Sequence, residues 1–358
     1  MNNTSGIFPS LTDILGQPIS REQALSLIPD DYTTQDRLKQ LSPASYEKLL
    51  SFLQGNSGLL ITYDNFFKKI FDPLLHPNRI QDFLSCILQK EIKTLQILPL
   101  EGIKLSDTGT FVMMDIVIET TDGEIIDVEM QKIGYHFPGQ RSDCYASDFI
   151  MRQYNRIKAQ KGKTFTYQDL KPIYIIILME QSSSEFKNTF PAYIHREIRS
   201  YDSGADVRHL SKNIYISLDV FKSVVHNITN KLDAWLTFLS SDKPEDIINL
   251  VSAYPAFIDL YHDIAEFRKD PKELIYMYSE ALSILDRNTA FYMIDEKQKE
   301  IEDLQALVAE QTTSLAEKEN TLAEKENTLT EKENALAEKE TTIAALQAEI
   351  ARLKKNQP

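Results

Sequence analysis

Two apolar segments joined by a tight turn constrain the fold of this 358-residue chain more than any other feature. The segments, residues 111–119 and 124–132, are rich in valine, isoleucine and methionine, and β-branched residues favour β-strands. Asp122 and Gly123 between them are a strong hairpin signal, because glycine readily adopts the left-handed backbone conformation that such turns need. We therefore predict an antiparallel β-hairpin.

The hairpin places acidic side chains where apolar ones are expected. A three-residue loop at residues 121–123 puts Asp115 directly opposite Glu129. Side chains alternate between the faces of a strand, so Asp127 and Gln131 share the face of Glu129, and the other face is apolar. Like charges opposite one another are destabilising and need solvent, a shared proton or a cation between them. A hard ion such as Mg²⁺ would satisfy them and keep waters that a phosphodiester can replace.

The spacing of these carboxylates also fits an ordinary charged sheet face, so the surrounding sequence has to decide between the two interpretations. The additional motifs are YDNFFKKIF at residues 63–71, IQDFLSCIL at residues 80–88 and, after the hairpin, Arg141, Tyr145, Gly162, Tyr167, Leu170, Pro172 and the apolar segment 173–179. In this order and at these spacings, the chain resembles the PD-(D/E)XK nuclease family transposases, also called recombination-promoting nucleases, over about residues 60–290.

The resemblance implies an α/β fold with a restriction-endonuclease-like core, in which helices flank a mixed sheet, and DNA cleavage with a divalent metal. Asp115 and Glu129 correspond to the metal-binding carboxylates, and Gln131 occupies the place of a lysine in the wider superfamily. Mg²⁺ is the expected ion, with Mn²⁺ and Ca²⁺ as alternatives. A lysine can orient or help to deprotonate the attacking water, whereas glutamine can only form hydrogen bonds with it. The metal would therefore have to acidify the water.

Asp64 and Lys68 lie one helical turn apart in the first motif. The resemblance gives Asp64 a supporting role, because it corresponds to the family's acidic residue on the first core helix and could reach the metal through a water. Lys68 could then pair with Asp64. A surface salt bridge without a catalytic role is an equally acceptable interpretation of the two residues.

The charge distribution limits where nucleic acid could bind. The formal net charge is −14, which opposes nonspecific attraction to DNA but does not exclude a local basic surface. Residues 141–171 hold seven basic and three acidic residues and follow the hairpin closely. We assign DNA contacts to Arg141, Arg152 and Arg156. The alternative is a solvated helix face on which Asp148 pairs with Arg152.

Other chemistry finds little support. The six histidines lack the spacing of a zinc site or a catalytic motif. The longest apolar run, residues 173–179, is far shorter than the roughly 20 residues that cross a bilayer, so we expect no membrane segment. The amino terminus lacks the basic and apolar regions of a secretory signal. Cys86 and Cys144 are the only cysteines, and we expect buried free thiols in a cytoplasmic protein.

The chain is predicted to have four parts: an amino-terminal helical extension at 1–58, a nuclease-like core at 59–220, a helical subdomain at 221–295 and a coiled coil at 296–358. Helical patterns occur at residues 20–27, 42–53, 142–160, 234–239, 245–251 and 272–285. Apolar strand patterns occur at residues 173–179 and 213–218. A Gly-Asn-Ser-Gly segment ends the extension, and Pro244, Pro255 and Pro271 mark helix ends.

The last part contains a seven-residue repeat. From Ser314 the segments SLAEKEN, TLAEKEN, TLTEKEN and ALAEKET follow one another. Position a of the heptad is apolar throughout and is occupied by Ile301, Val308, Leu315, Leu322, Leu329, Leu336, Ile343 and Ile350. Position d is apolar only at the two ends, at Leu304, Leu346 and Leu353, and is occupied between them by Gln311, Lys318, Lys325, Lys332 and Lys339.

An isolated charged helix is the alternative interpretation of this repeat. Such a helix would need ion pairs between residues three or four apart, and the repeat offers none, as the neighbours of Lys318 illustrate. We therefore predict a parallel homodimer through a coiled coil at residues 301–353, about 80 Å long. Lysines at position d would weaken the dimer and determine its register.

The sequence thus predicts a magnesium-dependent DNA endonuclease that hydrolyses phosphodiester bonds, is linked to recombination or mobile elements and forms a dimer. The alternative is an inactive nuclease fold retained as a DNA-binding or protein-interaction module, which the acidic balance and the missing lysine favour. Asp115, Glu129 and Gln131 favour the enzyme, because a module without catalysis has no need for opposed carboxylates. A metal-dependent hydrolase acting on RNA is a third option.

Overall fold

A computed structural model of the chain describes residues 9–98, 115–133 and 138–355. The chain divides into two compact units, Met1–Tyr292 (unit 1) and Met293–Pro358 (unit 2). The strands are β1 Thr94–Ile97, β2 Ile116–Thr120, β3 Ile125–Ile133, β4 Ile173–Gln181, β5 Ile194–Arg196 and β6 Ser211–Ser217. The α-helices are α1 Leu11–Leu15, α2 Arg21–Ser26, α3 Tyr32–Lys39, α4 Pro43–Gln54, α5 Asp64–Ile70, α6 Pro77–Leu88, α7 Pro138–Lys161, α8 Ser184–Lys187, α9 Leu218–Val224, α10 Lys231–Ser240, α11 Pro244–Ala253, α12 Ile258–Glu266 and α13 Pro271–Lys355.

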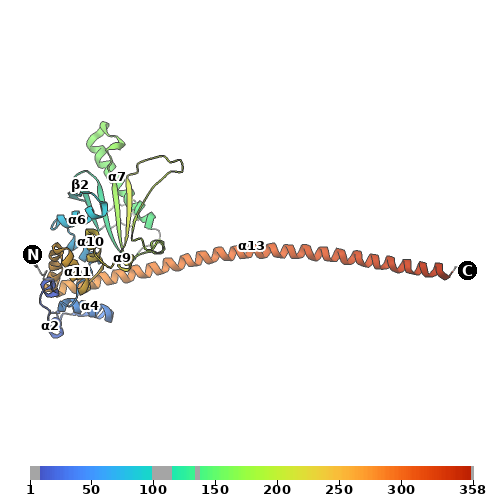
Figure 1. Ribbon diagram of the computed structural model, residues 1–358, viewed down its shortest axis with the longest axis horizontal. Helices are drawn as coiled ribbons and strands as arrows, with labels where there is room; N and C mark the ends of the chain where they lie inside the picture. The colour runs from blue at the N-terminus through green and yellow to red at the C-terminus, as the bar shows by residue number, and fades with distance from the viewer. Residues whose placement is uncertain (1–8, 99–114, 134–137, 356–358) are drawn as a thin grey trace, which may run out of the picture. The chain divides into compact units, whose positions relative to one another are not determined.

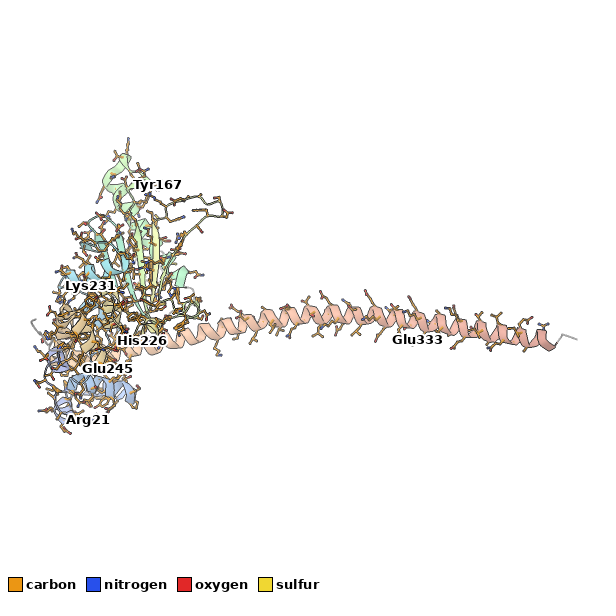
Figure 2. The ribbon with its side chains drawn as sticks, viewed as in Figure 1. Arg21, Tyr167, His226, Lys231, Glu245 and Glu333 are labelled. Atoms are coloured by element: carbon orange, nitrogen blue, oxygen red, sulfur yellow. The ribbon has the colours of Figure 1, made fainter. Side chains whose placement is uncertain are left out.

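Unit 2 consists of the later part of α13. Its side chains stand out from the helix on all sides, as around Glu333 (Figure 2). The apolar residues at heptad position a are exposed, from 47% at Ile301 to 62% at Leu336. Among the described residues 314–341, no ion pair forms, as the sequence predicts. The helix is confirmed, and its pairing with a second copy stays a prediction.

The sheet of unit 1 has the strand order β1-β2-β3-β4-β6-β5. Strand β4 lies parallel to both of its neighbours, β3 and β6. The pairs β1–β2, β2–β3 and β5–β6 are antiparallel. Helix α7 makes the crossover from β3 to β4, which parallel strands require. In Figure 1, α7 lies beside the strands, and the labels α4, α9, α10 and α11 gather at the lower end of the unit. The expected mixed sheet flanked by helices is confirmed.

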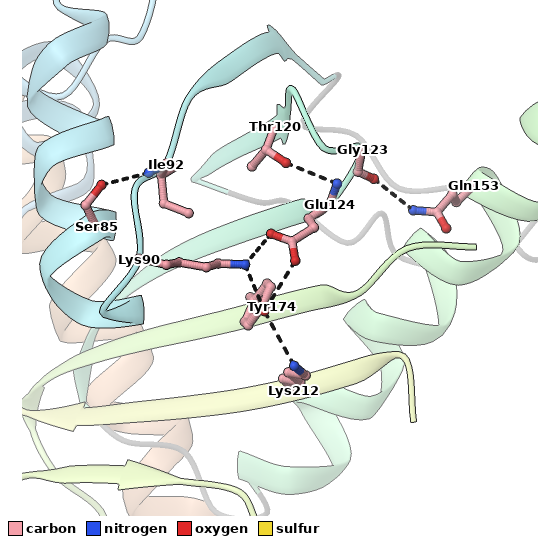
Figure 3. Close-up of polar contacts among 9 residues, drawn as sticks. All are labelled: Ser85, Lys90, Ile92, Thr120, Gly123, Glu124, Gln153, Tyr174 and Lys212. Atoms are coloured by element: carbon pink, nitrogen blue, oxygen red, sulfur yellow. Dashed lines mark hydrogen bonds and ion pairs between the residues drawn. The ribbon is translucent and has the colours of Figure 1, made fainter. Parts of the chain in front are cut away.

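The hairpin of β2 and β3 has the predicted register. Ile116 pairs with Val128 and Ile118 with Ile126. At the turn, the Gly123 N–H donates to the Thr120 carbonyl at 2.9 Å, and the φ of Gly123 is 80°. Figure 3 shows the turn with the Thr120 Oγ1 that accepts a further hydrogen bond, 3.1 Å from the backbone nitrogen of Glu124. The three-residue loop is therefore confirmed, while residues 111–114 lie outside the described part of the chain.

The two faces of the sheet carry separate apolar clusters. Ile126 and Val128 of β3 belong to the larger cluster, which also contains residues of α1–α6, α9–α12 and the start of α13. Ile125 lies on the opposite face and belongs to the cluster that includes Tyr145 and Phe149 of α7. Because both faces are covered, side chains on either face of β3 are withdrawn from water. The boundaries expected at residues 58 and 220 stay predictions. Helices from all three of the expected parts of unit 1 contribute residues to the larger cluster.

The amino-terminal helices begin and end where local chemistry requires. Ser20 and Gln23 exchange side-chain and backbone hydrogen bonds at the start of α2, which forms a capping box. Ser42 caps α4, and Pro43 occupies its first position. Gly55 ends α4 with a φ of 80°. The helices predicted at residues 20–27 and 42–53 are confirmed, as are those later in the chain, although α7 begins at Pro138.

Two further expectations have different outcomes. No helix in the described part of the chain is long and apolar enough to cross a membrane. The expected burial of both cysteines is wrong, because Cys86 is half-buried and Cys144 is exposed. Cys144 precedes Tyr145 in α7, and only the Tyr145 side of the helix faces the sheet.

Replacement of Gly123 by alanine tests the turn. A side chain disfavours the left-handed conformation, and an added Cβ would lie 3.3 Å from Lys171 Cγ. We expect Gly123→Ala to lower the free energy of unfolding by about 1–2 kcal/mol, measured by urea denaturation. Gly139→Ala is the control, because an added Cβ there meets no atom within 4 Å and the residue lies in α7. Equal losses in the two variants would contradict the assigned turn.

Candidate active site

The site is built on two carboxylates that face each other across the hairpin. Asp115 lies directly before β2, and Glu129 lies within β3. The Asp115 N–H donates to Glu129 Oε1 at 3.1 Å, and the Met130 N–H donates to Asp115 Oδ2 at 2.7 Å. Each side chain is thus held by the backbone of the opposite strand. The structure brings together the two residues that the sequence singled out as metal ligands.

Two cationic side chains approach the remaining oxygens of this pair. Lys68 of α5 places Nζ 3.2 Å from Asp115 Oδ1. Arg141, in the first turn of α7, places a guanidinium nitrogen 3.9 Å from Glu129 Oε2, and its guanidinium lies 5.2 Å from the centre of the Tyr145 ring. Positive charge from two helices therefore faces the carboxylates, where low polarity strengthens electrostatic attraction.

The acidic face of the hairpin is buried beneath α7. Asp127 is 0% exposed, Glu129 3% and Gln131 5%. An ordinary charged sheet face would be exposed to solvent, so that interpretation of these residues is wrong. Buried carboxylates are costly unless hydrogen bonds or opposite charges compensate them, and this burial is therefore unusual enough to indicate a functional site.

Burial and mutual repulsion change the acidity of the site. Burial raises the pKa of the Glu129 carboxyl well above its ordinary value, and the negative charges of Asp127 and Asp115 raise it further, whereas Arg141 lowers it. Burial also raises the pKa of Asp127, with a smaller contribution from Asp115. Without additional positive charge, the site therefore resists full ionisation.

Asp127 is the residue to which the sequence gave no role. Both of its carboxyl oxygens are buried and have no hydrogen-bond partner among the described residues. Its position two residues before Glu129 placed it on the same face, and that alternation was the available signal. What the alternation could not reveal was that α7 covers this face.

Gln131 and the lysine beside it lie on opposite faces of the sheet. The Gln131 amide is buried, and neither of its polar atoms has a hydrogen-bond partner in the described part of the chain. Lys132 instead donates to Thr62 Oγ1 at 2.7 Å and pairs with Glu180. Lys132 therefore cannot take the place of the lysine that Gln131 replaces. A lysine from another element, Lys68, does contact the carboxylate pair, at Asp115.

The other residues assigned from the sequence are more widely placed. Asp64 begins α5, but its side chain lies outside the described part of the structure. Arg152 pairs with Asp148 at 2.8 Å, which is the alternative that the sequence left open. Both terminal nitrogens of Arg156 donate to Glu119 at 2.6 Å. Of the three arginines, only Arg141 lies beside the carboxylates.

The residues present fit a divalent cation. Asp115 and Glu129 offer hard oxygen ligands, which divalent cations such as Mg²⁺ prefer. One oxygen of each carboxylate already faces a positively charged side chain. The unpaired Gln131 amide is suited to hydrogen-bond a water. No group of three or more His, Cys, Asp or Glu side chains within the described ranges is arranged to hold a metal. Waters and substrate oxygens would therefore complete the coordination, as is usual for Mg²⁺.

Comparison with known proteins gives one result. Residues 61–293 match the sequence model of a family described as PD-(D/E)XK nuclease family transposase. The matched segment covers more than half of the chain and includes Lys68, Asp115, Glu129 and Gln131. No curated protein and no solved structure matches the chain.

Replacement of Asp127 by asparagine tests the electrostatics of the site. The folded-state pKa of Asp127 is raised above its ordinary value of 3.8. Below about pH 3.8 the carboxyl is protonated in both the folded and the unfolded chain, and folding is not opposed by its charge. As the pH rises from there to the folded-state pKa, the free energy of unfolding falls, because the unfolded chain loses this proton more readily. Without divalent metal, we expect Asp127→Asn to raise the free energy of unfolding by about 1–3 kcal/mol near pH 7, and by less near pH 4.5, in urea denaturation.

The control for this prediction is Asp202→Asn, which removes the same charge from an exposed loop residue. Its effect should stay within about 0.5 kcal/mol at both pH values. A loss of stability in Asp127→Asn near pH 7 would contradict the buried, uncompensated carboxyl.

Proposed function

The chain belongs to the PD-(D/E)XK nuclease family transposases, and from this membership we propose that it is a magnesium-dependent DNA endonuclease of the cytoplasm. A nuclease-type function follows from the family. Hydrolysis of DNA phosphodiester bonds and a link to recombination or mobile elements are the parts that we propose. The observation that carries the proposal is the pair of half-buried Asp115 and buried Glu129, in which each carboxylate is held by the opposite strand.

Asp115 and Glu129 would hold the metal, and the neighbouring main-chain carbonyl is a further ligand candidate. When bound, a divalent cation would supply Lewis-acid stabilisation of the phosphate charge and a lower pKa for the attacking water. Burial supports this role, because α7 restricts solvent around the carboxylates and keeps electrostatic interactions strong. Mn²⁺ is the most similar alternative ion, and Ca²⁺ would support binding.

The remaining side chains would position the substrate and the water. Gln131 would orient the water by hydrogen bonds, since an amide cannot accept its proton to become charged. Lys68 and Arg141 would contact the scissile phosphate, where their charges offset the negative charge that develops in the transition state. Lys68 thereby supplies the positive charge that glutamine cannot. Its contact with Asp115 at 3.2 Å supports this role.

We further propose that the protein acts as a parallel homodimer through residues 301–353. The support is the apolar line of position-a residues, which is half-exposed or more along nearly all of unit 2. An isolated helix gains nothing from such a line, whereas two helices bury it against each other. A twofold pair of nuclease sites matches the two antiparallel strands of a DNA duplex.

The catalytic assignment predicts loss of cleavage when either carboxylate is neutralised. We expect purified wild type to nick supercoiled plasmid with Mg²⁺ or Mn²⁺ and not with EDTA. Asp115→Asn and Glu129→Gln should lose roughly 100-fold or more in rate. Both variants keep the size of the side chain and an oxygen that can accept the backbone hydrogen bond across the hairpin, so they should fold. Plasmid nicking followed on agarose gels measures the rate.

Asp202→Asn is the matched charge control, and its cleavage rate should equal that of wild type. Cleavage that persists in both site variants would refute the assignment of the hairpin. Absence of cleavage by folded wild type with every metal would favour the interaction module. Cleavage of RNA in preference to DNA would favour the RNA hydrolase.

The dimer is tested by charges placed on the apolar line. Leu322→Asp with Leu329→Asp puts two carboxylates at position a, where a parallel dimer would bury them against their copies. We expect this double variant to be monomeric by light scattering coupled to gel filtration, and wild type to be dimeric.

The control is Asn320→Asp with Asn327→Asp. It adds the same charge at position f, on the side of the helix away from the apolar line, and should stay dimeric. A wild-type monomer, or dimers of both variants, would contradict pairing through position a.

A further inference from the structure

The carboxy-terminal end of α7 and the turns that follow it form a projecting basic segment, residues 154–171, which we call the α7 tip. Figure 2 labels Tyr167 on this projection. Three aromatic rings pack against one another within the tip. Tyr154 stacks on Tyr167 with ring centres 6.3 Å apart, and Phe165 meets both rings edge-on. Tyr167 is nonetheless 76% exposed, so most of its surface is available to a ligand.

The tip contains four lysines, of which one has an acidic partner among the described residues. This is Lys161, which pairs with Asp169. In the part of the chain that the structure describes, Lys158, Lys163 and Lys171 form no ion pair with a carboxylate, and all three are exposed. Lys158 donates to the Tyr154 hydroxyl at 2.5 Å and lies over the Tyr154 ring. In a protein with a formal net charge of −14, a short segment that carries three such lysines and an exposed aromatic ring is a local site for a polyanion.

Helix α7 connects this segment to the candidate active site. Arg141 lies in its first turn, and Lys158 lies near its end, about 26 Å away at the helical rise per residue. That length corresponds to roughly 7–8 base pairs of a DNA duplex. Between Arg141 and Lys158, one of the exposed residues carries a carboxylate; these residues are Asp143, Cys144, Ser147, Met151 and Asn155. Asp143 lies 3.6 Å from the Arg199 guanidinium, so the outer side of α7 offers little repulsion to a phosphate backbone.

We propose that the α7 tip is a second contact for the DNA duplex that is cut at the hairpin, and that it holds the duplex arm roughly 7–8 base pairs from the scissile phosphate. Lys158, Lys163 and Lys171 contact phosphates, and the Tyr167 ring packs against the sugar–phosphate backbone. This inference rests on the proposed function, because it takes the substrate to be duplex DNA. It assigns the distal contact to lysines without an acidic partner within the described ranges, whereas Arg152 and Arg156 are engaged with Asp148 and Glu119.

The test measures binding without cleavage. Glu129→Gln protein is titrated against a fluorescent duplex of about 24 base pairs, long enough to reach the tip from a central site, at several salt concentrations with Ca²⁺. Each lost phosphate contact lowers the slope of log affinity against log salt by about 0.9. We expect the added substitutions Lys158→Gln, Lys163→Gln and Lys171→Gln to lower that slope by about 2.7. The ratio of the affinity with the unsubstituted tip to the affinity with the substituted tip should therefore fall about 40-fold between 50 and 200 mM salt.

The matched control combines Lys39→Gln, Lys48→Gln and Lys222→Gln. These lysines are also exposed and form no ion pair with a carboxylate among the described residues, but they lie on α3, α4 and α9. An unchanged slope in this control and a reduced slope in the tip variant support the tip. Equal slopes in the two variants overturn the tip contact and leave the endonuclease proposal intact. Failure of the parent protein to bind the duplex at all would overturn both.

Discussion

The structure around the candidate site depends on one exchange of hydrogen bonds across the hairpin. Backbone amides of two antiparallel strands each hold a carboxylate of the other strand. This arrangement orients Asp115 and Glu129 towards one another but does not neutralise them. Positive charge has to come from elsewhere in the chain, and it comes from Lys68 of α5 and Arg141 of α7. The carboxylates thus link a strand pair to one helix that precedes it in the sequence and one that follows it.

Burial gives this arrangement its chemical character. The same residues on an exposed sheet would be ionised, hydrated surface carboxylates. Beneath α7, Glu129 and Asp127 instead have raised pKa values, first because of burial and then because of neighbouring acidic groups. A fold that uses buried carboxylates in this way is less stable than one with an apolar face. The neighbouring strand β4 shows what an apolar face looks like, since Ile175 and Ile177 pack against α7 without any polar group to satisfy.

Local chemistry explains what could be predicted from the sequence. The turn at residues 121–123 determines the hairpin register, and alternation determines which side chains share a face, so the approach of Asp115 to Glu129 could be predicted. The covering of that face could not. The stripe of Tyr145 and Phe149 shows that α7 packs against something, but the face it covers depends on the path of the chain after β3.

Long-range contacts account for the other differences. Local spacing allowed a pair between Asp64 and Lys68, which stays a prediction because the Asp64 side chain lies outside the described part of the structure. Lys68 also contacts Asp115 on another element, which the spacing did not indicate. Arg156 is likewise matched to Glu119 of β2, a partner that no sequence spacing indicates. Cys144 was expected to be buried because cysteine usually is, but its position one residue before Tyr145 places it on the solvent side of α7. The residue type indicates only how often a side chain is buried on average, whereas the position of Cys144 on the helix determines its exposure.

The near-identical heptads of unit 2 have a consequence for how the chain can vary. Each repeat contributes one apolar residue in the same place, from Leu315 to Leu336, and the distinct sequences that flank the repeats carry the additional apolar positions. Gain or loss of one whole repeat would lengthen or shorten the helix by about 10 Å and leave its apolar line continuous. An insertion of any other small size would rotate the line around the helix. The length of unit 2 can therefore change in steps of one repeat while the spacing of its apolar residues stays the same.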